Sequence, residues 1–307
     1  MTREEAGGQL AVSSVSRLLG IPVPTIRSWE RRYGFPRPAR TEGSHRRYDH
    51  RDVEQLRALR DEITAGIRPA EAVVTIRRRF ASGHQQAELV RQIVDAGLDY
   101  EGSAIRSILN RAEAEIGLDQ TIQAVVLPVL REIGTLWQVG TCDVAHEHFV
   151  SQQVRAWLAR RLTVPGRRAE AAVLACGPND LHSIGLEAFS VLLTRRRGVR
   201  CLLLGAQTPV SSLVTACRSS GATAVVVTSH LNLNRRAAVA AIRAVAALPL
   251  GLRVFYAGNA FAASKARRSV PGHYLGRDLI VAADLVHATL DSPAPAASNR
   301  KRKGGTR

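Results

Sequence analysis

The spacing of apolar residues divides the chain into regions of different periodicity. From about residue 10 to residue 164, apolar residues recur every three or four positions, as they do in amphipathic helices. From residue 168 to residue 290, short apolar runs alternate with helical patterns, which is typical of a parallel sheet assembled from βα units. The pattern therefore predicts a multidomain chain that is helical in its first half and α/β in its second.

A helix-turn-helix pattern lies near the start of the chain. Val12–Leu19 is amphipathic, Gly20–Pro22 interrupts the helix, and Pro24 stands at the favoured first position of a second helix that ends at Arg32. Two helices joined by a tight turn containing glycine form a unit that enters the major groove of DNA. The second helix presents side chains suited to base edges and phosphates, namely Thr25, Arg27, Ser28, Arg31 and Arg32.

A basic turn and a further helix follow this unit. Gly34–Pro38 cannot continue a helix, and Gly43–Tyr48 is a basic turn that we expect to form a wing against a phosphate backbone. Asp49 then begins another amphipathic helix. Together, Thr25–Gly34 and Arg46–Asp49 resemble the DNA-binding domain of MerR-type regulators, in register and over about seventy residues.

This resemblance implies a winged helix-turn-helix that binds a pseudo-palindromic operator in double-stranded DNA as a dimer. The alternative is a structural three-helix unit whose arginines are incidental. By the resemblance, the recognition helix and the wing would supply the DNA-binding residues Thr25, Arg27, Trp29, Arg32, Arg46, Arg47 and Tyr48.

The net charge of +17 is unevenly distributed. Residues 1–80 carry 16 Lys and Arg against 10 Asp and Glu, and residues 291–307 carry 5 against 1. A cationic surface attracts nucleic acid, although an arginine-rich composition with solvated charge explains the same surplus. The last segment is rich in Pro, Ala and Ser before its basic residues, which predicts a disordered basic tail.

A helical bundle is predicted in the middle of the chain. The polar stretch at 80–88 is expected to be a linker, and the short connections after it favour an antiparallel four-helix bundle. The predicted helices lie near 87–97, 101–116, 118–139 and 143–164.

The second half of the chain is predicted to form a doubly wound parallel sheet. Its strands are expected at Ala171–Cys176, Val199–Leu204, Thr223–Thr228 and Arg253–Ala257. This alternation resembles the flavodoxin-like arrangement of cobalamin-binding domains. With the tail, the expected domains are 1–80 for DNA binding, 81–166 for the helical bundle, 167–290 for the sheet and 291–307 for the tail.

The turn after the first predicted strand carries candidate metal chemistry. Asp180, His182 and Gly185 lie between this strand and a helix predicted at Ser183–Arg195, at the edge where open α/β sheets bind ligands. A histidine there can bind a metal through one ring nitrogen while an acidic residue holds the other. A solvated loop histidine is the alternative. The spacing Asp-x-His-x-x-Gly resembles the lower-ligand motif of cobalamin-binding domains, in which the histidine binds cobalt.

Three residues of the bundle resemble a helical cap. Trp137 ends the third predicted helix, and Glu147 and His148 lie at the start of the fourth. Core packing and a surface pair would explain them, but their spacing resembles the cap of the light-sensing, adenosylcobalamin-binding MerR regulators. In that family the tryptophan packs against the adenosyl group, and a histidine follows it. Gln138 stands at that position here.

Two later strand ends resemble further elements of the cobalamin-binding domain. Ser229 and Leu231 match a Ser-x-Leu element, with His230 between them as an expected wall of the pocket. Gly258 matches the first residue of a Gly-Gly element, where Asn259 replaces the second glycine. Small residues would let the nucleotide tail of the cofactor pass close to the backbone.

The resemblance as a whole implies a transcriptional repressor. Adenosylcobalamin, with its cobalt on His182, would assemble a tetramer on the operator in the dark, and light would break the cobalt–carbon bond and disperse the tetramer. One alternative is a regulator that keeps the fold without the cofactor. Another is a corrinoid-dependent methyl-transfer protein, which the DNA-binding unit and the lack of a substrate-activating domain disfavour.

Cellular location follows from what the sequence lacks. No apolar run approaches the ~18 residues that span a membrane, and the first residues lack the apolar core of a secretory signal. The four cysteines show no metal-ligand spacing, so reduced thiols are expected. These features predict a cytoplasmic protein without a membrane partner.

Overall fold

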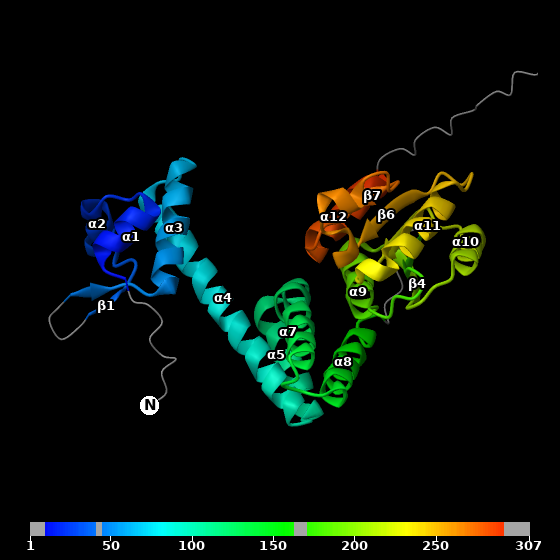
Figure 1. Ribbon diagram of the computed structural model, residues 1–307, viewed down its shortest axis with the longest axis horizontal. Coiled ribbons are helices and arrows are strands. Elements are labelled where there is room, and N and C mark those ends of the chain that lie inside the picture. Colours follow the sequence, from blue (N-terminus) through cyan, green and yellow to red (C-terminus); the bar gives the residue numbers. More distant parts are fainter. Residues whose placement is uncertain (1–9, 41–44, 163–170, 292–307) are drawn as a thin grey trace, which may run out of the picture. The chain divides into compact units, whose positions relative to one another are not determined.

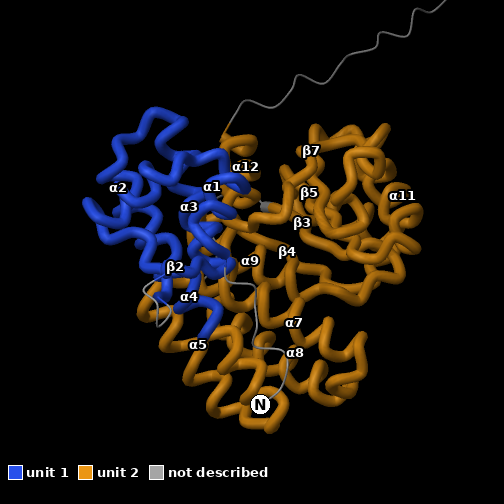
Figure 2. Tube along the Cα trace, turned by 60° about the vertical axis from the view of Figure 1, so that its left-hand side comes forward, with its two compact units in different colours: residues 1–88 blue, residues 89–307 orange. Residues whose placement is uncertain are grey.

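The computed structural model describes residues 10–40, 45–162 and 171–291 (Figure 1). The chain forms two compact units that divide after Glu88 (Figure 2). The tip of the predicted wing, the end of the fourth predicted bundle helix and the predicted basic tail lie outside the described residues. Within those residues, no helix is both long and apolar enough to cross a membrane.

The first unit contains the predicted helix-turn-helix and the base of the wing. Gly20 and Gly34 adopt left-handed conformations directly after the first two helices, which ends each helix there. Asp49 and Asp52 form a reciprocal capping box that begins the third helix. The two short strands pair antiparallel. The elements are α1 (Val12–Leu19), α2 (Val23–Tyr33), β1 (Ala39–Arg40), β2 (Arg46–Arg47) and α3 (His50–Thr64).

Helix α4 corrects the predicted linker. It runs from Pro69 to Leu98, so the stretch at 80–88 is helical and not a loop. This stretch contains Gly83 but no proline. A single glycine costs a helix only about 1 kcal/mol relative to alanine, which the flanking helix-forming residues offset.

The second unit begins with the helical bundle, formed by the end of α4 and the helices after it. The predicted third bundle helix is three elements, because a π-helical turn interrupts it. Pro128 has no N–H for an α-helical hydrogen bond, and just before it the Leu127 N–H bonds to the Ile122 carbonyl, five residues back. The elements are α5 (Gly102–Ile116), α6 (Leu118–Thr121), η1 (Ile122–Val126), α7 (Leu127–Gln138) and α8 (Val144–Ala159).

A five-stranded parallel sheet completes the second unit. Its strand order, β4-β3-β5-β6-β7, is that of flavodoxin-like sheets, as the resemblance implies. The two-residue strand β7 was not predicted, because two residues carry no visible alternation. The strands are β3 (Ala171–Cys176), β4 (Arg200–Gly205), β5 (Ala224–Thr228), β6 (Arg253–Ala257) and β7 (His273–Tyr274). The helices are α9 (Ile184–Arg197), α10 (Val210–Ser219), α11 (Arg235–Ala246) and α12 (Leu279–Asp291), with short 3₁₀ turns η2 (Asn232–Asn234), η3 (Asn259–Phe261) and η4 (Ser264–Arg267).

Helices cover both faces of this sheet (Figure 1). Leu174 of β3 belongs to a core shared with α9, α12 and the bundle, whereas its neighbour Val173 belongs to a core shared with α10 and α11. The connections that leave β3 and β5 therefore run to opposite faces. The loops between them, at the carboxyl ends of the strands, lie at the topological switch point where such sheets bind ligands.

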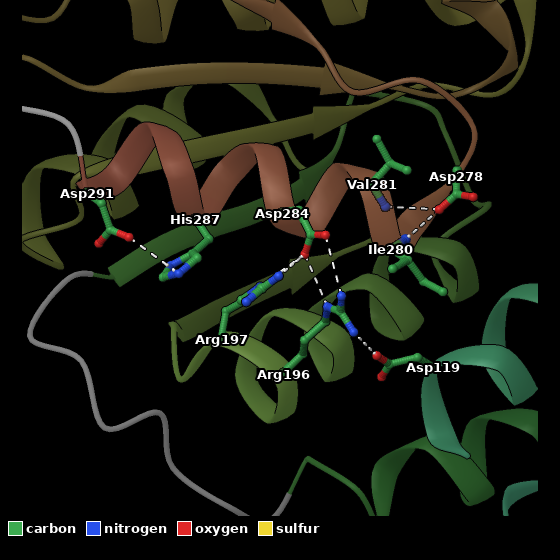
Figure 3. A network of polar contacts seen from close by, with 9 residues as sticks. All are labelled: Asp119, Arg196, Arg197, Asp278, Ile280, Val281, Asp284, His287 and Asp291. Atoms are coloured by element: carbon green, nitrogen blue, oxygen red, sulfur yellow. Dashed lines mark hydrogen bonds and ion pairs between the residues drawn. The ribbon is translucent and has the colours of Figure 1, made fainter. Parts of the chain in front are cut away.

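A polar network joins the sheet helices to the bundle (Figure 3). Asp284 of α12 accepts hydrogen bonds from Arg196 and Arg197 at the end of α9, and these guanidinium groups lower the pKa of the Asp284 carboxyl. Arg196 also reaches Asp119 of α6 at 2.5 Å. The side chain of Gln123 in η1 accepts a backbone N–H from the first turn of α12. These contacts attach the α6–η1 end of the bundle to the sheet helices.

Candidate functional site

Asp180 and His182 form a carboxylate–imidazole pair on the loop after β3. Asp180 Oδ1 lies 2.9 Å from His182 Nδ1 and accepts the His182 backbone N–H at 3.0 Å. Asp180 Oδ2 accepts the backbone N–H of His230, on the loop after β5, at 2.5 Å. The Asp180 side chain is fully buried, and the His182 side chain is half exposed. The carboxylate holds the Nδ1 edge of the ring and leaves Nε2 as the nitrogen that can bind a metal.

The charges around the pair set its protonation. Burial alone would raise the pKa of Asp180, but hydrogen bonds from His182 and His230 outweigh it and hold that pKa well below its usual range. The hydrogen bond with Asp180 raises the pKa of His182 against the opposing effect of burial, and the charge of Glu147 adds to the rise. Burial lowers the pKa of His230. Asp180 is therefore a carboxylate at ordinary pH.

Polar atoms beside the pair are available to a ligand. Ser229 Oγ and His230 Nδ1 are buried and have no hydrogen-bond partner among the described residues. The His230 ring stacks on the His182 ring, with centroids 5.6 Å apart. Gly258 has a φ of +104°, and a Cβ there would lie 2.1 Å from the Ser229 carbonyl oxygen. The loops after β5 and β6 therefore meet backbone against backbone, which only glycine permits.

Exposed apolar side chains, and a glycine that faces open space, lie near the same loops. Leu181 flanks His182, and Leu231 and Leu233 follow β5; all three leucines are exposed. Exposed leucines gathered at one sheet edge are typical of a binding surface. Gly185 lies in the first turn of α9, and a Cβ there would meet open space.

The bundle contributes the start of α8 to this site. His148 Nδ1 lies 2.6 Å from Glu147 Oε2, and Glu147 Oε1 accepts the hydroxyl of Ser151 at 2.7 Å. Glu147 lies eight residues before Arg155, on the face of α8 from which Arg155 donates to Ser183 of the loop. Trp137, at the end of α7, is half exposed, and in the described part of the chain no ring contact or hydrogen bond joins it to the His182 loop.

Cationic side chains suited to DNA lie in the first unit. Arg27 and Arg32 of α2 are exposed, and Arg47 of β2 is half-buried. None of the three has an ion-pair partner among the described residues, so their charges are available to phosphates. Thr25 is half-buried at the start of α2.

Two of the residues predicted at the DNA interface pack inside the first unit. Tyr48 is fully buried and its hydroxyl donates to Glu30, and Trp29 packs in the same core. Arg46 Nε also donates to Glu30, at 2.5 Å. The two bonds to Glu30 hold the base of the wing on the recognition helix. Glu30 was not identified from the sequence as the partner of these wing residues, although an acidic residue in a basic helix can be recognised there.

A second missed residue is Arg155 of α8, which contacts the loop residue after His182. Its only signal is spacing, because it lies eight residues after Glu147 and therefore on the same helix face. This spacing does not identify Arg155 from the sequence alone, because its partner Ser183 becomes known only from the structure.

Comparisons with known proteins agree with this arrangement. Residues 10–77 match the family "MerR HTH family regulatory protein", and residues 89–162 match the family "B12 binding domain". The fold resembles that of the monomethylamine corrinoid protein of Methanosarcina barkeri, with a TM-score of 0.56 and 12% identity over 66% of this chain and 99% of that one.

Two curated relatives come from Myxococcus xanthus. The HTH-type transcriptional repressor CarA is 33% identical over 68% of this chain and 72% of its own length. The HTH-type transcriptional repressor CarH is 35% identical over 66% of this chain and 72% of its own length. With identity of this level over most of both relatives, the chain belongs to the MerR-type family of transcriptional regulators that includes CarA and CarH.

Proposed function

We propose that this protein is a DNA-binding transcriptional repressor that binds cobalamin through His182 and is not an enzyme. The observation that carries the proposal is the buried Asp180 carboxylate, which orients a half-exposed imidazole at the switch point of the sheet. The match of the bundle to a B12 binding domain supports the same ligand.

The residues present fit a corrinoid cofactor. One imidazole nitrogen is available for cobalt, and Ser229 and His230 offer buried polar atoms that lack partners. The close approach at Gly258 keeps the adjoining loops free of side-chain bulk. Exposed leucines around His182 match the apolar edge of a large ring.

Each residue of the site has a distinct part in holding the cofactor. Asp180 fixes the orientation of the His182 ring, whose Nε2 would hold cobalt. Glu147 and His148 would line the opposite side of the pocket, with Trp137 as a flat apolar wall against an adenosyl group. When bound, adenosylcobalamin supplies a cobalt–carbon bond that light can break.

The regulatory proposal follows from these parts. We propose that the bundle, with adenosylcobalamin bound, would adopt the state in which dimers assemble into a tetramer on the operator, and that it would leave this state on illumination. In the assembled state, the arginines of α2 and β2 in each copy would bind DNA, as expected for a dimer that binds two half-sites.

Titration of the purified protein with adenosylcobalamin in the dark tests the cofactor site. The affinity and the visible spectrum are the measurements. Asp180→Asn is expected to weaken binding about 10–100-fold, and His182→Ala by more, since ligand-orienting residues contribute about that much. His50→Ala, in the first unit, is the control and is expected to bind normally. A normal spectrum and affinity in His182→Ala would refute the assignment, and a wild-type protein that binds no cobalamin would favour the cofactor-free regulator.

An operator selected from random duplexes tests the DNA site. Arg27→Ala is expected to lose about 1–3 kcal/mol at a base contact, or to reduce the salt slope of log K by about 1 at a phosphate contact. Arg218→Ala removes the same charge from the sheet unit and is expected to bind DNA normally. Unchanged affinity and slope in Arg27→Ala would remove α2 from the interface.

A further inference from the structure

Arg155 connects the bundle to the loop that carries His182. It lies on α8, and its Nη2 donates to the hydroxyl oxygen of Ser183 at 2.8 Å. Its Nε lies 3.4 Å from Glu187 Oε1 in α9. The Ser183 hydroxyl in turn donates to the same Glu187 oxygen at 2.8 Å. The three side chains form a closed polar triangle between a bundle helix and the residue that follows the proposed cobalt ligand.

Ser183 is placed so that this contact constrains His182. Its side chain is almost fully buried, and its backbone N–H donates to the Leu181 carbonyl at 2.9 Å, across His182. A serine that precedes a helix ordinarily caps it, but the Ser183 hydroxyl makes no cap hydrogen bond to α9. The hydroxyl instead serves Arg155 and Glu187.

Arg155 belongs to a polar stripe on α8. Glu147, Ser151 and Arg155 are spaced four residues apart, which places them on one helix face. Glu147 accepts a hydrogen bond from the Ser151 hydroxyl, and Arg155 donates to Ser183 of the loop. The stripe therefore lies on the face of α8 that contacts the ligand loop.

We propose that Arg155 is a positioning residue for the cobalt ligand: by holding Ser183, it makes the placement of His182 depend on the position of α8. This inference rests on the proposed binding of cobalamin at His182. Because coupling between two sites is reciprocal, cofactor bound to His182 also favours the docked position of α8.

A second polar contact between bundle and sheet helices provides the control. Asp119 of α6 binds Arg196 of α9 at 2.5 Å, at the end of α9 remote from the ligand loop (Figure 3). It joins the same two parts of the unit as Arg155 does, but it has no contact with the Asp180–Ser183 segment. A merely structural role in docking the bundle would be shared by both contacts.

The experiment titrates the full-length protein with adenosylcobalamin in the dark and follows affinity and the visible spectrum that reports imidazole coordination. Arg155→Met is expected to bind about tenfold more weakly, because a hydrogen bond from a charged donor is lost, and to show a smaller imidazole-coordinated fraction. Arg155→Lys keeps a charged donor and is expected to recover part of both. Asp119→Asn is expected to bind within about twofold of wild type with an unchanged spectrum.

Ser183→Ala keeps the test independent of the folding of Arg155→Met. Ser183→Ala removes the hydroxyl that Arg155 binds and is expected to show the same loss of cobalamin affinity. The Arg155→Met/Ser183→Ala double variant is expected to bind little more weakly than either single variant, since both remove the same contact. Normal affinity and spectrum in Arg155→Met and Ser183→Ala would overturn the inference while leaving cobalamin binding intact. An equal loss in Asp119→Asn would also overturn it. A wild-type protein without cobalamin binding would refute the proposed function and this inference with it.

Discussion

Replacing Tyr48 with phenylalanine separates the two roles open to residues of the wing. Tyr48 is fully buried in the core of the first unit, and its hydroxyl donates to Glu30. Burial and the hydrogen bond to Glu30 raise the pKa of Tyr48, so the hydroxyl keeps its proton at ordinary pH. Phenylalanine fills the same space without the oxygen, so the substitution removes one hydrogen bond and opens little cavity.

The expected cost is about 1.5–3 kcal/mol of local stability, which is the contribution of a hydrogen bond to a charged group. Glu30 has 9% of its side chain exposed and keeps the bond from Arg46, so water only partly replaces the lost donor. Hydrogen exchange at buried α3 amides, such as that of Leu56, measures this cost in the full-length protein. It requires no assumption that a multidomain chain unfolds in one step.

DNA binding gives the contrasting measurement. Arg47→Ala removes a cation of the wing and is expected to lower the salt slope of log K on a random-sequence duplex by about 1, with normal exchange in α3. Tyr48→Phe is expected to leave that slope unchanged. A Tyr48→Phe protein with normal exchange and a slope reduced by about 1 would refute the buried, wing-holding role.

Three further predictions concern the second unit. Gly258→Ala is expected to lose about 1–3 kcal/mol of stability to backbone strain, because its Cβ would press on the Ser229 carbonyl; urea unfolding with and without cobalamin checks this, and unchanged midpoints would contradict it. Hydrogen bonds from Arg196 and Arg197 lower the pKa of Asp284, so these contacts contribute their full stability above about pH 4. This contribution, under about 1 kcal/mol after solvent screening, is lost as the pH falls through the pKa of Asp284 in the folded protein. Melting temperatures between pH 7 and pH 3 are expected to fall less steeply in Asp284→Asn, and equal slopes would contradict this. Illumination of the adenosylcobalamin complex is expected to release cofactor more readily from wild type than from Gln138→His, because an amide is a poorer ligand for a transition metal than imidazole; equal retention after gel filtration would contradict it.

The structural features that could be predicted are those determined by residues close together in the sequence. Strands β3 and β5 were visible because a strand buried on both faces is a continuous apolar run. The helical state of 80–88 was not visible, because polar composition describes a solvated helix as well as a loop. The full burial of Tyr48 was not predictable, because an aromatic residue in a basic motif fits a core and an interface equally.

Asp180 shows why one half of the candidate site was predictable and the other was not. Its Oδ1 serves the backbone and ring of His182, two residues away, and a contact so local leaves a fixed spacing in the sequence. Its Oδ2 serves the backbone N–H of His230, fifty residues away, and any residue with an N–H could fill that position. Arg155 lies 28 residues before Ser183, on a helix that the ligand motif does not include. The motif therefore predicts which residue binds the metal, whereas the contacts that fix the position of that residue can be identified only from the structure.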